Sequence, residues 1–216
     1  MKEIMQFQNA NLETIYDGNL RIGSFSEIRN CLFAGYFAMD KFSCVSRSKL
    51  GWATGIGSFS YVSDCEISNY VSIASRVSIG AFNHPLDFLS VNEIGYRPDN
   101  WGLPKKENIN IARKITKIGP DVWIGDNCFV KAGLSIGIGT IIGGGAVVLK
   151  DTPPFSIVSG NPARVIRYRL DERLRTLALT SLWWELPPND LRDIDFSNVE
   201  SALISIAEIY KSKLST

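Results

Sequence analysis

The sequence predicts a mainly β protein, a parallel β-helix with one long excursion loop and a C-terminal helical tail. Aliphatic residues recur every six positions over residues 118–148, a related period runs through residues 22–79, and both periods vanish between Ile79 and Ile118. An amphipathic helix would instead place its apolar residues three and four positions apart. Three short strands joined by tight corners make one coil, and the inward aliphatic residues of successive coils stack on one another.

The six-residue repeat is clearest after the interruption. Its aliphatic positions are Ile118, Ile124, Val130, Ile136, Ile142 and Val148. Glycine follows most of them, as at Gly119, Gly125 and Gly137. Glycine tolerates unusual backbone angles, so these positions predict tight corners between the strands.

The N-terminal half carries the repeat in a shorter form, with a period of seventeen residues. The three aliphatic series are Ile22, Met39, Ile56 and Ile73; Ile28, Val45, Val62 and Ile79; and Phe33, Leu50 and Ile67. One side of each coil is therefore one residue short. The phenylalanines Phe25, Phe42 and Phe59 share the period, which predicts a stacked ladder on one face. Met5 and Ile15 are expected in a ragged capping coil, because an open end would expose unpaired strand edges.

Two segments leave the repeat. The β-helix domain is expected over residues 1–170, with the excursion loop at 80–117, and a C-terminal α-helical extension over 171–216. An excursion of this length is more typical of a functional loop than of a simple connection. The Asn161-Pro162 pair is expected to turn the chain away from the coils. In the tail, Ser197 and Glu200 have the spacing of a helix capping box.

Composition excludes several classes of function. Lys and Arg total 23 against 22 for Asp and Glu, so no overall field attracts nucleic acid or an anionic membrane. No apolar run is long enough for a transmembrane segment or a secretion signal, which predicts a cytoplasmic protein. The four cysteines show no C-x-x-C spacing and the chain has one histidine, so neither a metal site nor a disulfide framework is expected.

Several motifs occur together with this repeat: Asn83-His84-Pro85 where the excursion begins, Trp123 where the repeat resumes, Asn161-Pro162 after it, and Trp183-Trp184 in the tail. In this combination the chain resembles the hexapeptide-repeat acyltransferases. It is similar to their xenobiotic acetyltransferase branch, which includes streptogramin and chloramphenicol enzymes and relatives that O-acetylate bacterial polysaccharides. The resemblance implies left-handed coils, although parallel crossovers in general are right-handed. It also implies a homotrimer with each active site in the cleft between neighbouring subunits.

The resemblance implies that His84 is the catalytic base. Transfer of an acetyl group to an alcohol requires removal of the hydroxyl proton, and an imidazole, with an ordinary pKa of ~6.5, suits this step. The alternative is a loop imidazole with only a structural hydrogen bond. Asp87, Glu93 or a backbone carbonyl are all candidates for orienting the ring. Asn83 is a candidate for positioning the acceptor or the oxyanion.

The resemblance implies acetyl-CoA as the acyl donor. Pantetheine is expected along the corners, beside Asp126, Gly144, Ala146 and Leu149, with Trp123 next to the thioester. Cations are expected at the phosphates, because guanidinium and ammonium groups bind phosphate oxygens. The candidates are Lys150, Arg164 and Arg167, followed by Lys131 and Arg169. The alternatives are a tryptophan that only covers the prism and cations that are only solvated.

The predicted reaction is O-acetylation of a carbohydrate hydroxyl, on a bacterial polysaccharide or its precursor. Alternatives are O-acetylation of an antibiotic, N-acetylation of an amino sugar, and a non-enzymatic β-helix scaffold or binding module. Phe82, Phe88, Tyr96 and Trp101 in the excursion suit a sugar ring and an aromatic drug equally. The sequence therefore predicts a small-molecule or saccharide acceptor without selecting between them.

Overall fold

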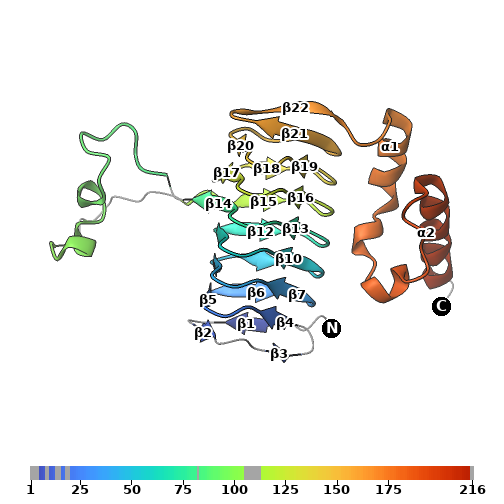
Figure 1. The fold of residues 1–216 in the computed structure, drawn as a ribbon, viewed down its shortest axis with the longest axis horizontal. Coiled ribbons are helices and arrows are strands. Elements are labelled where there is room, and N and C mark those ends of the chain that lie inside the picture. Colours follow the sequence, from blue (N-terminus) through green and yellow to red (C-terminus); the bar gives the residue numbers. More distant parts are fainter. Residues whose placement is uncertain are drawn as a thin grey trace.

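In the computed structural model, which describes residues 5–7, 10–12, 16–17, 20–81, 83–104 and 113–214, the chain forms a three-sided prism of stacked coils (Figure 1). The three sheets contain six, seven and nine strands and are called here faces A, B and C. From β4 to β21 all neighbouring strands within each face pair in parallel. The predicted parallel β-helix is confirmed.

From β4 to β20, successive strands visit the faces in the order C, B, A. Face A consists of β1 (Met5–Phe7), β6 (Cys31–Phe33), β9 (Lys49–Leu50), β12 (Cys65–Ile67), β15 (Thr116–Ile118) and β18 (Ser135–Ile136). Face B consists of β2 (Ala10–Leu12), β5 (Ser26–Arg29), β8 (Cys44–Ser46), β11 (Tyr61–Ser63), β14 (Ser78–Ala81), β17 (Phe129–Lys131) and β20 (Val147–Val148). Face C consists of β3 (Tyr16–Asp17), β4 (Leu20–Ile22), β7 (Phe37–Met39), β10 (Thr54–Ile56), β13 (Ser72–Ile73), β16 (Trp123–Ile124), β19 (Ile141–Ile142), β21 (Ser156–Gly160) and β22 (Ala163–Tyr168).

The repeat residues form the core of the prism. Ile28, Val62 and Val130 on face B and Ile124 and Ile142 on face C are all fully buried. Pairing keeps equivalent residues in register, since Ile73 lies opposite both Ile56 and Ile124. Each coil therefore buries its aliphatic residues against the coils above and below it, which is the main source of stability in such a fold.

The corner between faces B and A explains the short period. Inward residues on these two faces are five positions apart in the N-terminal coils, as from Val62 to Ile67, and six apart from Val130 to Ile136. The extra residue falls beside Gly133, which has a φ of 81°. The excursion leaves the prism at this same corner, between β14 and β15 (Figure 1).

The phenylalanine ladder forms at a corner rather than on a face. Phe25, Phe42 and Phe59 connect face C to face B and stack with ring centroids 5.0 and 5.1 Å apart. All three have positive φ angles and are exposed to solvent. The seventeen-residue period therefore predicts the stacking correctly, and the left-handed backbone places the rings outside the prism.

The N-terminal strands cap the prism in the opposite direction. β1, β2 and β3 pair antiparallel with β6, β5 and β4, one on each face. The predicted cap is thus present, although as antiparallel strands and not as a further coil. Ile15 lies outside the described residues.

The C-terminal segment first returns to the prism. At Asn161-Pro162, a cis peptide bond, the chain reverses, and β22 runs antiparallel to β21 on face C. The expectation that this pair turns the chain away was wrong, because Ala163–Tyr168 still completes face C. The helices follow: α1 (Glu172–Ser181), short 3-10 turns η3 (Trp183–Glu185) and η4 (Pro188–Leu191), and α2 (Val199–Leu214).

Two polar contacts and an aromatic contact fasten the tail to the prism. Asn69 Nδ2 donates to the carbonyl of Trp184 over 2.9 Å, and Tyr70 donates to the carbonyl of Leu186. The Tyr70 and Trp183 rings are 5.1 Å apart. The tryptophan pair therefore packs between the tail and the prism.

The predicted capping box at Ser197 was wrong. Asn198 caps α2, because its side-chain oxygen accepts the backbone N–H of Ser201 over 3.1 Å. The Ser197 hydroxyl instead donates to Asp195 Oδ1.

Candidate active site

A β-bulge directs the chain from the prism into the excursion. The register of β14 against β17 shifts between Ile79 and Ala81, so Gly80 is the extra residue. Gly80 has a φ of 72°, and a Cβ at this position would lie 1.9 Å from the carbonyl oxygen of Ser63. Only glycine fits this backbone, and it starts the excursion three residues before Asn83.

The His84 imidazole contacts two groups in the described part of the excursion. Its Nδ1 lies 2.6 Å from the carbonyl oxygen of Val91 and 2.8 Å from the Tyr96 hydroxyl. A carbonyl oxygen can only accept a hydrogen bond, so Nδ1 carries a proton, and in the neutral ring the lone pair is therefore on Nε2. Of the candidates for orienting the ring, the backbone carbonyl makes this contact, and Tyr96 is a partner that the sequence did not suggest.

Other described residues of the excursion pack around Tyr96. It is buried, and Phe88 packs edge-on against it with ring centroids 6.4 Å apart. Burial, together with the negative charge of Glu93, raises the pKa of the Tyr96 phenol. The hydroxyl therefore stays protonated at neutral pH. The flanking turns η1 (Glu93–Gly95) and η2 (Pro98–Trp101) fix its position.

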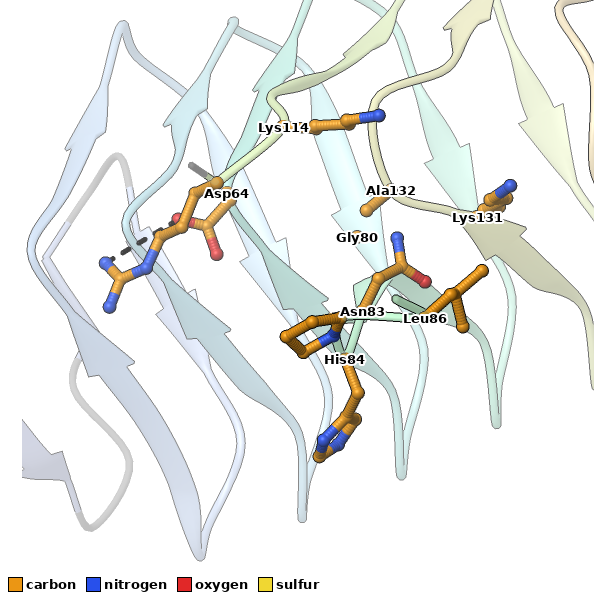
Figure 2. A pocket seen from close by; sticks show the side chains of 10 residues that line it. Asp64, Gly80, Asn83, His84, Leu86, Lys114, Lys131 and Ala132 are labelled. Carbon is orange, nitrogen blue, oxygen red and sulfur yellow. Dashed lines mark ion pairs between the residues drawn. The ribbon is translucent and has the colours of Figure 1, made fainter. Parts of the chain in front are cut away.

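A cavity of about 370 Å³ lies where the excursion leaves the prism, and Asn83 and His84 both line it. Figure 2 shows Lys114, Ala132 and Lys131 along one side of this pocket and Asn83 and Leu86 along the other. The His84 imidazole extends away from the two lysines in this view. Phe82 lies outside the described residues.

Trp123 is not part of this pocket. It lies on β16 of face C, with its side chain about half exposed, whereas His84 follows β14 of face B. One protomer therefore does not bring Trp123 and His84 together.

The predicted donor-site residues divide between two corners. Asp126 and Gly144 lie in successive coils at the corner from face C to face B, where the Gly145 N–H donates to the Asp126 carbonyl. Leu149 and Lys150 follow β20 and lie at the corner from face B to face A, and Lys131 ends β17 next to this corner. Ala146 is fully buried and its N–H and carbonyl are both bonded within the prism. The structure thus assigns Ala146 to the core and not to a ligand surface.

The candidate arginines differ in their surroundings. Arg164 and Arg167 are exposed on β22, opposite Ser159 and Ile157 of β21. Arg169 instead donates to Asp121 Oδ2 and to the Gly139 carbonyl, each over 2.9 Å. Arg169 is therefore a structural residue of the prism, whereas Arg164 and Arg167 are accessible to a ligand.

Among the described residues, no group of three or more His, Cys, Asp or Glu side chains is arranged to hold a metal ion. The four cysteines are free; Cys31, Cys65 and Cys128 are buried and Cys44 is half-buried. None of the described helices is long and apolar enough to cross a membrane.

Comparison with solved structures identifies the fold. The N-acyltransferase AntD from Bacillus cereus superposes with a TM-score of 0.58 at 20% identity, covering 76% of this chain and 88% of AntD. The acetyltransferase domain of PglB from Neisseria gonorrhoeae superposes with a TM-score of 0.51 at 18% identity, covering 68% and 57%. The shared fold is the left-handed parallel β-helix of acyltransferases.

Comparison with sequences identifies the family. A chloramphenicol acetyltransferase from Agrobacterium fabrum is 32% identical over 178 residues, which are 81% of this chain and 79% of that protein. A probable macrolide acetyltransferase from Lysinibacillus sphaericus is 34% identical over 152 residues, 68% and 84%. No family model matches the sequence. The chain belongs to the hexapeptide-repeat acetyltransferases and is an acyltransferase.

Proposed function

We propose that this protein transfers an acetyl group directly from acetyl-CoA to a carbohydrate hydroxyl, with His84 as the general base. The contact between His84 Nδ1 and the Val91 carbonyl carries the proposal. It fixes the tautomer in which Nε2 accepts a proton, and it comes from the same loop that places His84 at the pocket. The Tyr96 hydroxyl supports the same ring position.

In this mechanism Nε2 of His84 takes the acceptor's proton as the hydroxyl oxygen attacks the thioester carbonyl carbon. The tetrahedral intermediate then collapses, the carbon–sulfur bond breaks, and the CoA sulfur takes the proton back from the imidazolium. Asn83 lines the same pocket as His84 and is proposed to donate to the acceptor or to the oxyanion. No acyl-enzyme is required.

The donor site is proposed at the exposed corners of the upper coils. A Cβ on Gly145 would meet nothing within 4 Å, so a ligand can approach this backbone closely. AntD and the PglB domain were solved with coenzyme A and acetyl coenzyme A, which supports a CoA donor on this fold. Lys150, Arg164 and Arg167 are exposed cations close to the same end of the prism and are proposed as phosphate contacts.

Lys150→Ala and Arg167→Ala are each expected to weaken CoA binding by about 1–3 kcal/mol, the loss of one charge-assisted hydrogen bond. Calorimetry with CoA and with dephospho-CoA measures this and separates the 3′-phosphate from the pyrophosphate. Lys41→Ala and Arg21→Ala, exposed residues of the N-terminal coils, are the matched controls. Unchanged affinity for both ligands would show that Lys150 and Arg167 are only solvated cations and do not contact the phosphates.

A homotrimer with a shared cleft is proposed because one protomer separates His84 from Trp123. The described part of the excursion also exposes apolar side chains, among them Leu86, Leu89 and Val91, as it projects from the prism (Figure 1). A neighbouring subunit would cover these side chains and supply the second wall of the site.

Light scattering is therefore expected to give a mass of about 72 kDa, three times the 24.0 kDa of the chain. Leu89→Ser, which removes an exposed apolar side chain of the excursion, is expected to weaken the assembly. A monomer at micromolar concentration would eliminate the shared cleft. We place the reaction in the cytoplasm, where the four free cysteines stay reduced.

Antibiotic O-acetylation is the second candidate, because the relatives at 32% and 34% identity are named for chloramphenicol and macrolides. N-acylation of an amino sugar is the third, since AntD was solved with dTDP-4-amino-4,6-dideoxyglucose. A screen of saccharides, chloramphenicol, macrolides and amino sugars with acetyl-CoA decides among them. Thiol release and a product heavier by one acetyl group are expected with a saccharide. Transfer only to the drugs or only to amines would contradict the proposal.

A further inference from the structure

The pocket beside His84 is strongly cationic. Arg113, Lys114 and Lys131 all line it, and Asp64 is the one acidic residue among its described lining residues. The chain as a whole has a formal net charge of +1, so this concentration of cations is local. A cleft lined by one sign of charge attracts ligands of the opposite sign.

Asp64 does not neutralise the pocket, because Arg47 already pairs with it. Arg47 Nε and Nη2 donate to Asp64 Oδ1 and Oδ2 over 2.9 and 2.8 Å, and Ser63 Oγ donates over 2.7 Å. Burial raises the pKa of Asp64, but the hydrogen bonds from Arg47 and Ser63 outweigh it and lower the pKa below its ordinary value. The carboxylate is therefore ionised, nearly buried and balanced by Arg47. Arg113, 3.9 Å from Asp64, adds charge that this pair does not cancel.

Lys114 and Lys131 carry charge that no described carboxylate balances. None of the ion pairs among the described residues includes either of them. The aliphatic part of Lys114 lies close to the backbone of Gly133, since a Cβ built on that glycine would be 2.7 Å from Lys114 Cβ. The two lysines lie on the same side of the pocket, flanking Ala132 (Figure 2). Among the described residues, the protomer places no carboxylate against this pair, so the two lysines are available to an anionic ligand.

We infer that the acceptor is an acidic saccharide, whose carboxylate or phosphate lies against Lys114 and Lys131 while one of its hydroxyl groups faces His84. This inference rests on the proposed function and names its substrate class. A neutral drug would leave the lysines unused. The CoA phosphates are at the far end of the pantetheine arm from the thioester, whereas this pocket lies beside the base.

The test uses the whole protein saturated with CoA, so that donor phosphates are already bound. Calorimetry compares methyl glucoside, glucuronate and glucose 6-phosphate, which separate the neutral sugar, the carboxylate and the phosphate. The anionic sugars are expected to bind at least about tenfold more tightly than the neutral one, and the advantage should fall with added salt. The stronger of the two identifies the anion.

Lys114→Gln combined with Lys131→Gln is expected to abolish this preference and leave CoA affinity unchanged. Lys117→Gln, an exposed residue of β15 on face A, is the control and should keep it. Equal binding of the three sugars, no binding of the anionic ones, or a preference that survives the double substitution overturns the inference. So does a loss of CoA affinity, which would assign the lysines to the donor.

Failure of the inference is distinguishable from failure of the proposed function. His84-dependent acetylation of a neutral hydroxyl acceptor retains the O-acetyltransferase and removes the acidic saccharide. Acetylation restricted to amines and independent of His84 removes the O-acetyltransferase itself.

Discussion

His84→Ala is expected to lower turnover about 10²–10⁴-fold, the usual contribution of a general base, while CoA affinity stays within a factor of a few. The base and the donor contacts belong to different parts of the protomer, since His84 lies in the excursion and the proposed phosphate contacts lie in or after the last coils. Steady-state kinetics on the acceptor found in the screen, together with CoA calorimetry, measures both quantities.

The pH dependence of the rate identifies the base. Because Nε2 must be unprotonated to accept the hydroxyl proton, the wild-type rate is expected to rise with pH through a single ionisation, and His84→Ala should flatten that rise. Tyr96→Phe is the graded control. It removes one contact to Nδ1 and leaves the Val91 carbonyl, so its loss of turnover should be much smaller. Wild-type turnover in His84→Ala on the true acceptor would eliminate the proposed mechanism.

Gly80→Ala is expected to destabilise the protein by about 3–5 kcal/mol, because it combines backbone strain with a steric clash. The residue has a φ of 72°, and the added Cβ would lie 1.9 Å from a backbone oxygen that cannot move independently of β11. Urea denaturation measures the free energy of unfolding. Activity should fall as well at temperatures where the variant stays folded, since the bulge sets the direction in which His84 leaves the prism.

Two other glycines separate the components of this effect. Gly145 has a φ of 73° and an added Cβ would meet nothing within 4 Å, so Gly145→Ala should cost only the strain, about 1–2 kcal/mol. Gly55 has neither problem, and Gly55→Ala should stay within about 0.5 kcal/mol of the wild type. Equal stability of the Gly80 and Gly55 variants would show that the bulge relaxes freely.

Periodic features were predictable from the sequence because each coil repeats the environment of the last. The repeat also predicts that Ala146 is buried, whereas the family resemblance had placed it at the donor site. It occupies the position held in earlier coils by Ser26, Ser43 and Ser60, all of which are buried. The Arg47–Asp64 pair likewise spans seventeen residues, one full period. A search for polar residues at the repeat spacing would have found it.

The contacts inside the excursion could not be predicted in this way. The loop has no period, and the group that orients His84 includes the backbone carbonyl of Val91, which every residue type possesses. Tyr96 stood out only as an aromatic residue, because nothing in its spacing from His84 indicates that the chain folds back through η1. Trp123 and His84 lie apart within one protomer because they belong to different faces of the prism. The sequence alone predicted this only indirectly, through the expectation that each active site lies between two subunits.

In the N-terminal half, the number of seventeen-residue coils sets the length of the prism. Each layer contacts only the ones directly above and below, so its contribution is nearly independent of the total number of layers. Duplicating residues 40–56 would add one coil. It would move the later coils away from the N-terminal cap by one strand spacing, about 4.8 Å, and leave the pocket unchanged. Evolution and design can therefore change the length of the N-terminal half of the prism, provided that whole coils are added or removed.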